Sequence, residues 1–316
     1  MSTAETHDAS PRLKPLGAAT LRELSVKSNL AGALRAASHY GMILLIATLI
    51  WLVSSRYGLA WALPLMALQG YFVAFLFMVV HETAHKTAFR SRALNLAVGN
   101  LSAFAIGLPY EYYYLFHWDH HRYTQDPEKD PELIVGPKPA SDTQLAIAYS
   151  GLLQVLVRIR LMLHHALTGR VIVPWIPEGK RAMIVMEARL YLACYLLLLI
   201  ASLALHSATL LWVWIVPLFA GQLILRPYLY AEHTGCERTR SAFENTRTTM
   251  TGRIMKWFAW NMPYHVEHHA YPTVPFHALP KLNAAVDGHI VFRGRNYRAV
   301  TRETWAWFRR QRQTAA

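Results

Sequence analysis

Three histidine clusters are the part of this 316-residue sequence best suited to chemistry. Spacings of three and four residues place side chains on one face of a helix, so that several imidazoles can converge on one metal ion. Histidines packed at a membrane interface are the alternative, which we prefer only for the isolated His7, His39, His164, His165, His206 and His289. The clusters are His81-Glu-Thr-Ala-His85, His117-Trp-Asp-His120-His121 and His265-Val-Glu-His268-His269.

The eight clustered imidazoles are more than one metal ion requires. A structural zinc ion takes four ligands, whereas eight nitrogens suit two metal ions that keep open positions for water or O2. Imidazole binds iron as well as zinc, and zinc cannot change its redox state. Next to a bilayer, such a site suggests two iron ions that activate O2 for the oxidation of lipid-like C–H bonds.

The first cluster also matches the H-E-x-x-H signature of zinc proteases, with Glu82 as the general base. An intramembrane zinc metalloprotease is therefore a second hypothesis. It would use one zinc ion, His81, His85 and one further ligand. The six histidines of the other two clusters would then have no role.

The composition places these clusters in a membrane protein. Of all residues, 53% are hydrophobic and 16% are charged, whereas soluble domains carry about 25% charged residues. The net charge of +13 could attract nucleic acid, but the long apolar runs favour basic loops against an anionic membrane surface. We therefore expect membrane lipids and no nucleic acid as partners. Two cysteines, Cys194 and Cys236, cannot build a disulfide scaffold.

Four apolar runs are long enough to cross a bilayer as helices. They form two hairpins, Ala36–Val53 with Leu59–Val80 and Leu190–Leu205 with Thr209–Leu225. The shorter Asn95–Leu108 is expected to be re-entrant or interfacial. We predict an all-α membrane protein with four transmembrane helices in two hairpins and a cytoplasmic helical cap that holds a dimetal site. The expected division is an N-terminal cytoplasmic tail at 1–35, a membrane domain at 36–282 and a cytoplasmic C-terminal segment at 283–316.

The basic residues predict the orientation in the membrane. The two tight turns within the hairpins contain one basic residue, Arg56, and nearly all other Lys and Arg lie on the opposite side. That side is cytoplasmic by the positive-inside rule. A hairpin that crosses twice separates the second cluster from the third, so all three clusters are expected on the cytoplasmic face.

The clusters and their flanks resemble the membrane fatty-acid desaturase/hydroxylase family, and its bacterial branch in particular. The three boxes occur in the family's order, and the segments 231–235 (AEHTG), 245–249 (NTRTT) and 260–280 are also similar. The resemblance implies a diiron centre, O2 as co-substrate, a fatty acyl or lipid substrate and a bacterial inner membrane. An additional histidine after the last span matches His233. The implied iron ligands are His81, His85, His117, His120, His121, His233, His265, His268 and His269.

The implied activity is O2-dependent desaturation of a fatty acyl chain. Hydroxylation or monooxygenation of a fatty acid or another lipid-like substrate is the alternative within the same family. We recognise no fused electron-carrier domain in the sequence. A separate ferredoxin, rubredoxin or cytochrome, with its reductase, is therefore expected to dock on the basic cap.

Carboxylates near the boxes could orient the ligands, because a metal-bound histidine usually donates its second N–H to an oxygen. Glu82, Asp119 and Glu267 are the candidates, with ordinary solvated charges as the alternative. We assign no role to the segment 126–132 (DPEKDPE). The aromatic run Tyr110–Phe116 could line an acyl tunnel, but an interfacial aromatic belt is favoured.

Overall fold

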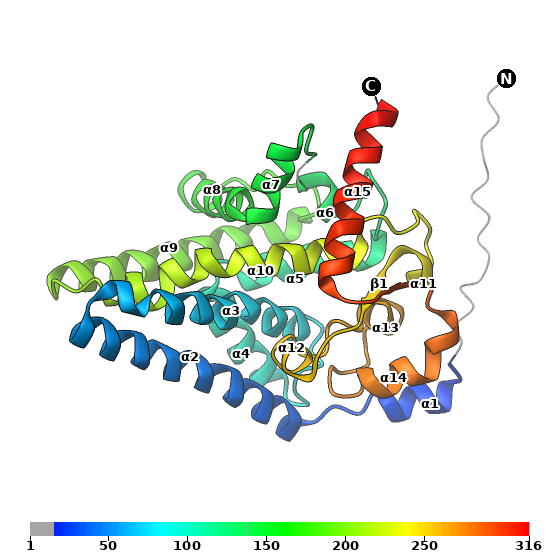
Figure 1. The fold of residues 1–316 in the computed structure, drawn as a ribbon, viewed down its shortest axis with the longest axis horizontal. Helices are drawn as coiled ribbons and strands as arrows, with labels where there is room; N and C mark the ends of the chain where they lie inside the picture. Colours follow the sequence, from blue (N-terminus) through cyan, green and yellow to red (C-terminus); the bar gives the residue numbers. More distant parts are fainter. Residues whose placement is uncertain (1–15, 137, 316) are drawn as a thin grey trace.

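The computed structural model describes residues 16–136 and 138–315, and the described chain is almost entirely helical (Figure 1). The longer helices are α2 (Asn29–Tyr57), α3 (Leu59–Ala84), α4 (Arg92–Ala105), α5 (Tyr110–Tyr123), α8 (Leu152–Thr168), α9 (Arg181–Ala204), α10 (Val216–His233) and α15 (Tyr297–Ala315). The shorter ones are α1 (Ala18–Leu24), α6 (Pro131–Val135), α7 (Asp142–Ser150), α11 (Ala242–Asn245), α12 (Arg253–Phe258), α13 (His265–Ala270), α14 (Leu279–Val286), η1 (Glu178–Lys180), η2 (Leu211–Ile215) and η3 (Asp287–His289). Strands β1 (Arg247–Thr249) and β2 (Phe292–Gly294) pair in parallel.

Within the described residues, four helical segments are long and apolar enough to cross a membrane: Asn29–Tyr57, Leu59–Ala84, Glu178–Ala204 and Leu211–His233. The shortest has 23 residues, about 35 Å of helix, against a hydrocarbon core of about 30 Å. These segments form the two predicted hairpins, with the histidine-bearing ends on one side (Figure 1). The chain is therefore an all-α membrane protein.

Each of the four helices extends beyond its predicted apolar run at one end or at both. Helix α2 begins seven residues before Ala36, because the Oγ of Ser28 accepts the N–H of Ala31 and caps the helix there. Residues 1–15 of the expected tail, with His7, lie outside the described residues. The expected C-terminal segment packs on the rest of the chain, since Arg309 and Arg312 of α15 pair with Asp142 of α7.

The two hairpins pack closely where α3 crosses α10, because the residues at the crossing are small. A Cβ at Gly70 would lie 2.6 Å from the carbonyl oxygen of Pro217, and a Cβ at Gly221 would lie 2.0 Å from that of Gly70. The side-chain amide of Gln69 donates to the carbonyls of Ile43 and Val213, at 3.1 and 3.2 Å. Close backbone approach and interhelical hydrogen bonds are how membrane helices associate, so the two helices that carry His81 and His233 are held rigidly.

The short apolar insert turns back sharply. Helix α4 is bent by 100° relative to α5, which agrees with a re-entrant or interfacial segment rather than a straight fifth span. The favoured aromatic belt was wrong for Tyr110, Tyr112 and Tyr113, which are at most 9% exposed. They pack into the core because α5 lies under the cap, where the Tyr110 hydroxyl donates to the carbonyl of Thr83 at 2.8 Å.

Candidate metal centre

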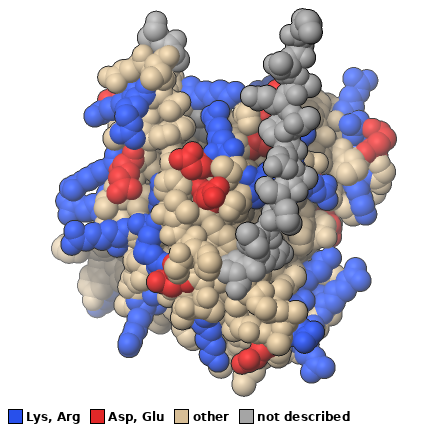
Figure 2. All heavy atoms as spheres, turned by 90° about the vertical axis from the view of Figure 1, so that its right-hand side faces the viewer, with Lys and Arg blue, Asp and Glu red and all other residues tan. Residues whose placement is uncertain are grey.

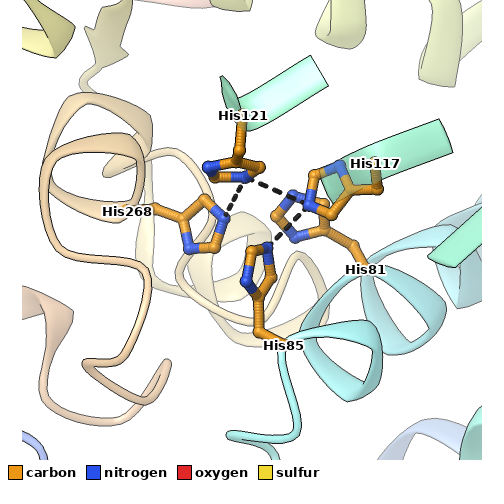
Figure 3. Close-up of side chains that lie close together, drawn as sticks. All are labelled: His81, His85, His117, His121 and His268. Carbon is orange, nitrogen blue, oxygen red and sulfur yellow. Dashed lines mark hydrogen bonds between the residues drawn. The ribbon is translucent and has the colours of Figure 1, made fainter. Parts of the chain in front are cut away.

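Five imidazoles from three helices converge in one group, which we call the five-imidazole group (Figure 3). His81 and His85 come from the end of α3, His117 and His121 from α5, and His268 from α13. One ring nitrogen of each lies within 4.8 Å of the others. The Nε2 of His117 lies 2.7 Å from that of His85 and 3.1 Å from that of His121. The Nε2 atoms of His121 and His268 are 3.2 Å apart.

The remaining four predicted histidines form an adjacent four-imidazole group. His120, His233 and His269 bring one ring nitrogen each within 4.8 Å of the others. The Nε2 of His265 lies 3.1 Å from that of His233. The rings of His121 and His269 stack with their centroids 4.0 Å apart, so the two groups are neighbours. The structure thus brings all nine predicted residues together.

Helix geometry explains how the second and third boxes divide between the groups. Residues four apart project about 40° from each other, and the intervening histidine of H-x-x-H-H projects to the other side of the first. The second box gives His117 and His121 to the five-imidazole group and His120 to its neighbour. The third box does the reverse, giving His268 to the five-imidazole group, while His265 and His269 belong to the other. The second and third boxes therefore each contribute to both groups, whereas the first box contributes only to the five-imidazole group.

The Nε2 atoms of the five-imidazole group are arranged as ligands of a bound cation rather than as partners in a hydrogen-bond network. Each Nε2 has one in-plane position, which holds either a hydrogen or a lone pair, and so it can enter one N–H···N bond. His117 and His121 each have two Nε2 neighbours, so the three contacts cannot all be such bonds. A metal ion accepts every lone pair at once. Burial, and then repulsion among the imidazoles, lowers the pKa of His85, His117 and His121, which keeps these lone pairs free.

Carboxylates support the four-imidazole group. The Oδ1 of Asp130 lies 2.9 Å from the Nδ1 of His120, and a carboxylate oxygen of Glu132 lies 3.9 Å from the same atom. Burial lowers the pKa of His120, but Glu132 and Asp130 outweigh it and raise that pKa to about 9. The Oε1 of Glu232 lies 3.4 Å from the Nδ1 of His265. An oxygen at Nδ1 leaves Nε2 as the metal-binding atom and makes it more basic.

Uncharged oxygens face the other two rings of this group. The Nδ1 of His233 lies 3.2 Å from the backbone carbonyl oxygen of Asn245. The Nδ1 of His269 lies 3.4 Å from the Oγ of Thr124. Three of the four imidazoles therefore have a hydrogen-bonding oxygen at Nδ1, which leaves their Nε2 atoms free to bind a metal ion, and the fourth, His265, has a carboxylate oxygen 3.4 Å from its Nδ1.

The three carboxylates selected from the sequence contact other groups instead. Their hydrogen bonds within the described chain go to backbone and to side chains other than histidine. They therefore do not orient the imidazoles. The carboxylate of Glu82 accepts the N–H of Phe276 at 3.0 Å, that of Glu267 accepts the hydroxyl of Thr248 at 2.5 Å, and that of Asp119 pairs with Arg122 at 3.4 Å.

Sequence reasoning missed Asp130, Glu132 and Glu232. Asp130 had a detectable local signal, because Asp followed by Pro131 is a common helix start, and its carboxylate does accept the N–H of Glu132 at the start of α6. That signal predicts a cap and not a contact with His120. Glu232 directly precedes His233 in the sequence but reaches a different histidine, so its contact has no sequence signature.

A buried carboxylate of α9 holds the helix that carries the second box. The two oxygens of Glu187 accept the backbone N–H groups of Glu111 and Tyr112, at 2.7 and 3.1 Å. These are the first turn of α5, where a negative charge satisfies free N–H groups and the helix dipole. Glu187 is 9% exposed. It therefore links the orientation of α5 to the second transmembrane hairpin.

The comparisons with known proteins agree with this geometry. The family model described as fatty acid desaturase matches residues 58–301, which are 244 of the 316 residues and include both imidazole groups. A search of curated proteins gives no significant match to the chain.

Proposed function

The chain belongs to the fatty acid desaturase family, and we propose that it is a diiron enzyme that uses O2 to desaturate the acyl chains of lipids. The observation that carries this proposal is the pair of adjacent groups of five and four convergent imidazoles at the end of the transmembrane helices. Two redox-active ions held side by side suit a two-electron oxidation by O2.

The nine histidines would hold one iron ion in each group, and bound iron supplies the O2 chemistry that oxidises an unactivated C–H bond. The protein's own contribution is to position and protect that centre. Asp130 fixes the ring of His120 through a hydrogen bond, and the carboxylate of Glu232 lies next to the ring of His265. Burial of His85 and His268, at 6% and 0% exposure, excludes water. The site lies where α3 and α10 end, and we place the acyl chain of a lipid from the adjacent leaflet against it.

The overall reaction balances as follows. Desaturation removes two hydrogens from adjacent carbons and, with O2, two electrons and two protons, yields an alkene and two water molecules. Hydroxylation consumes the same reactants but places one oxygen atom in the product and releases one water. The family includes both outcomes, so the fate of the oxygen distinguishes desaturase from hydroxylase.

The geometry gives little support to a zinc protease. A protease would need Glu82 to face a water molecule on the metal as general base. Instead, the Oε1 of Glu82 accepts the N–H of Phe276. His81 and His85 also lie in a group with three further imidazoles, which leaves no separate two-histidine zinc site.

The orientation and the electron donor are part of the proposal. We place the cap in the cytoplasm of a bacterium, with the spans in its inner membrane. Figure 2 shows Lys and Arg side chains around the rim of the cap and only a few Asp and Glu on that face. An acidic ferredoxin, rubredoxin or cytochrome, reduced by its own reductase, fits such a surface. Cysteine labelling from outside should reach Ser207→Cys and should not reach Arg238→Cys.

The activity is tested with purified protein, a ferredoxin, its reductase, NADPH, acyl lipid and 18O2. We expect about two irons per chain and a product two hydrogens lighter, with no 18O in the lipid. One 18O atom in the product would replace the desaturase with a hydroxylase. One zinc per chain after growth in iron-replete medium would reject the diiron centre.

A further inference from the structure

The tryptophan inside the second box packs against the five-imidazole group. Trp118 lies on α5, and its ring centroid is 5.1 Å from that of His85 and 6.3 Å from that of His121. His85 comes from the end of α3 and His121 from α5, and both belong to the five-imidazole group (Figure 3). One indole ring therefore lies next to two proposed ligands of the same metal ion.

Trp118 is partly exposed, whereas most of the imidazoles of this group are buried. His85, His117 and His268 are 6%, 2% and 0% exposed, while Trp118 has intermediate exposure. Its Nε1 atom is shielded and has no hydrogen-bond partner within the described chain, so packing alone holds the ring. Trp118 therefore connects the surface of the protein with ligands that a second protein could not contact.

The surroundings of Trp118 indicate that its exposed part faces water rather than lipid. Arg122 follows Trp118 by one turn of α5 and lies on the same face. Its side chain is 66% exposed and pairs with Asp119 at 3.4 Å, and a charged group this exposed is costly in hydrocarbon. Trp118 also lies outside the four candidate spans of the described chain.

A second cation lies on the other side of the indole ring. Tyr114 precedes Trp118 by one turn, with the ring centroids 6.3 Å apart. The Nζ of Lys86 lies 4.7 Å from the centre of the Tyr114 ring and 3.5 Å from its hydroxyl. Lys86 has a φ of 58°, a conformation that is uncommon without glycine and occurs often at functional sites. We call the row formed by Lys86, Tyr114, Trp118 and Arg122 the Trp118 strip.

We propose that electrons reach the metal centre through Trp118 and that an acidic electron-carrier protein docks on the Trp118 strip. This inference rests on the proposed function, because O2 is reduced only if electrons reach the iron from outside. Electron tunnelling slows steeply with distance and is faster through packed atoms than through water. The indole ring replaces such a gap between the surface and His85. Lys86 and Arg122 would attract the carboxylates of the carrier.

Each docking event would transfer one electron. The carrier loses one electron to a ferric ion, which becomes ferrous, and no bond forms or breaks. Trp118 provides the path through its π-system and is itself neither oxidised nor reduced. Two successive dockings supply the two electrons that, together with two protons, are consumed with each O2.

The first test follows the electron in the absence of lipid and O2. A saturating amount of reduced [2Fe–2S] ferredoxin is mixed anaerobically with the full-length, iron-loaded protein, and the oxidation of ferredoxin is recorded by stopped-flow absorbance. We expect the rate per bound iron to fall severalfold in Trp118→Leu. Trp118→Phe should largely restore it, because an aromatic ring is kept and no hydrogen bond of Nε1 is lost. The matched control is Trp305→Leu, a partly exposed tryptophan that packs on Tyr149.

The outcomes of this test separate the electron path from the proposed function. Equal rates in Trp118→Leu and the parent would overturn the path, since the electron would then enter elsewhere, for example at the partly exposed His121. Equal slowing in Trp305→Leu would also overturn it, because the effect would not depend on contact with the imidazoles. A parent protein that holds iron but takes up no electrons would contradict the proposed function itself.

The second test measures docking and requires no electron transfer. Binding of oxidised ferredoxin to the iron-loaded protein in neutral detergent is measured by calorimetry at low and at physiological salt. We expect the double variant Lys86→Gln, Arg122→Gln to bind about tenfold more weakly at low salt and to show less salt dependence. Arg310→Gln, an exposed arginine of α15, should bind like the parent. Weakening by Arg310→Gln but not by the double variant would place the carrier on α15 and overturn the docking surface.

Discussion

The two imidazole groups use the same side chain but are supported differently. In the five-imidazole group, the Nδ1 atoms of His81, His85 and His268 have no hydrogen-bond partner among the described residues. In the four-imidazole group, the Nδ1 atoms of His120, His233 and His269 each have a hydrogen-bonding oxygen, and only that of His265, with a carboxylate oxygen of Glu232 at 3.4 Å, makes no hydrogen bond among the described residues. The five-imidazole group would thus hold its metal ion through the number of its nitrogen ligands, and the four-imidazole group through the basicity of its nitrogens. The two metal positions are therefore expected to be inequivalent.

The largest effect should come from removing one imidazole from either group. His268→Ala and His120→Ala each take one ligand from a different group. We expect each to abolish product formation and to lower iron from about two to about one per chain, because a metal site loses most of its affinity with a missing ligand.

Mössbauer spectra of the two variants should retain different iron signals, and His164→Ala, an isolated histidine of α8, is the control. Identical residual spectra would mean that the two groups do not hold separate ions.

A smaller effect should follow from removing one carboxylate. In Asp130→Asn the oxygen next to the Nδ1 of His120 loses its charge. Loss of such a partner weakens metal binding by about 10- to 100-fold, so a chelator should remove the iron of the four-imidazole group first. The comparison is Asp119→Asn, which changes a carboxylate inside the second box whose partner among the described residues is Arg122. If both variants release iron at the same rate, the carboxylate contact has no role in holding the metal.

Substitution of a residue that supports both imidazole groups should weaken metal binding in both groups equally. Glu187 caps α5, which carries histidines of both groups. In Glu187→Gln the charge at the helix start is lost, and we expect a destabilisation of about 1 kcal/mol, as for other helix caps. Thermal unfolding measures it, and partial iron loss should be shared between the two Mössbauer components. Loss from a single component would show that Glu187 acts on one group rather than through α5.

The smallest effect on iron affinity is expected from removing the contact between Thr124 and His269. The hydroxyl of Thr124 donates to the carbonyl of His120 at 2.7 Å and lies 3.4 Å from the Nδ1 of His269. In Thr124→Val both contacts are lost with little change of volume. Since the His269 contact is long and uncharged, we expect iron affinity to fall by only a few-fold, measured with the chelator assay used for Asp130→Asn. A loss of iron affinity as large as that of Asp130→Asn would contradict the expectation that a charged partner of Nδ1 contributes more to iron binding than an uncharged one.

Sequence patterns of short range were reliable in this chain. The apolar runs identified all four candidate membrane-spanning helices of the described chain, because a membrane requires about 20 apolar residues in a row. Their ends were less well predicted, since polar residues such as Ser28 cap or extend a helix without changing its hydrophobicity. The aromatic run at Tyr110 was misread because burial under a cap and exposure at an interface select the same residue types.

The sequence by itself determined which residues could bind metal and that they would lie on one membrane face. Box spacing is a local property, and a helix converts it directly into direction. Only the tertiary structure decided that His268 joins one group while His265 and His269 join the other. It also decided that Asp130, rather than Asp119 inside the box, supports His120. These contacts depend on how α3, α5, α10 and α13 pack, and the spacing of residues along one chain does not encode which separate helices will meet.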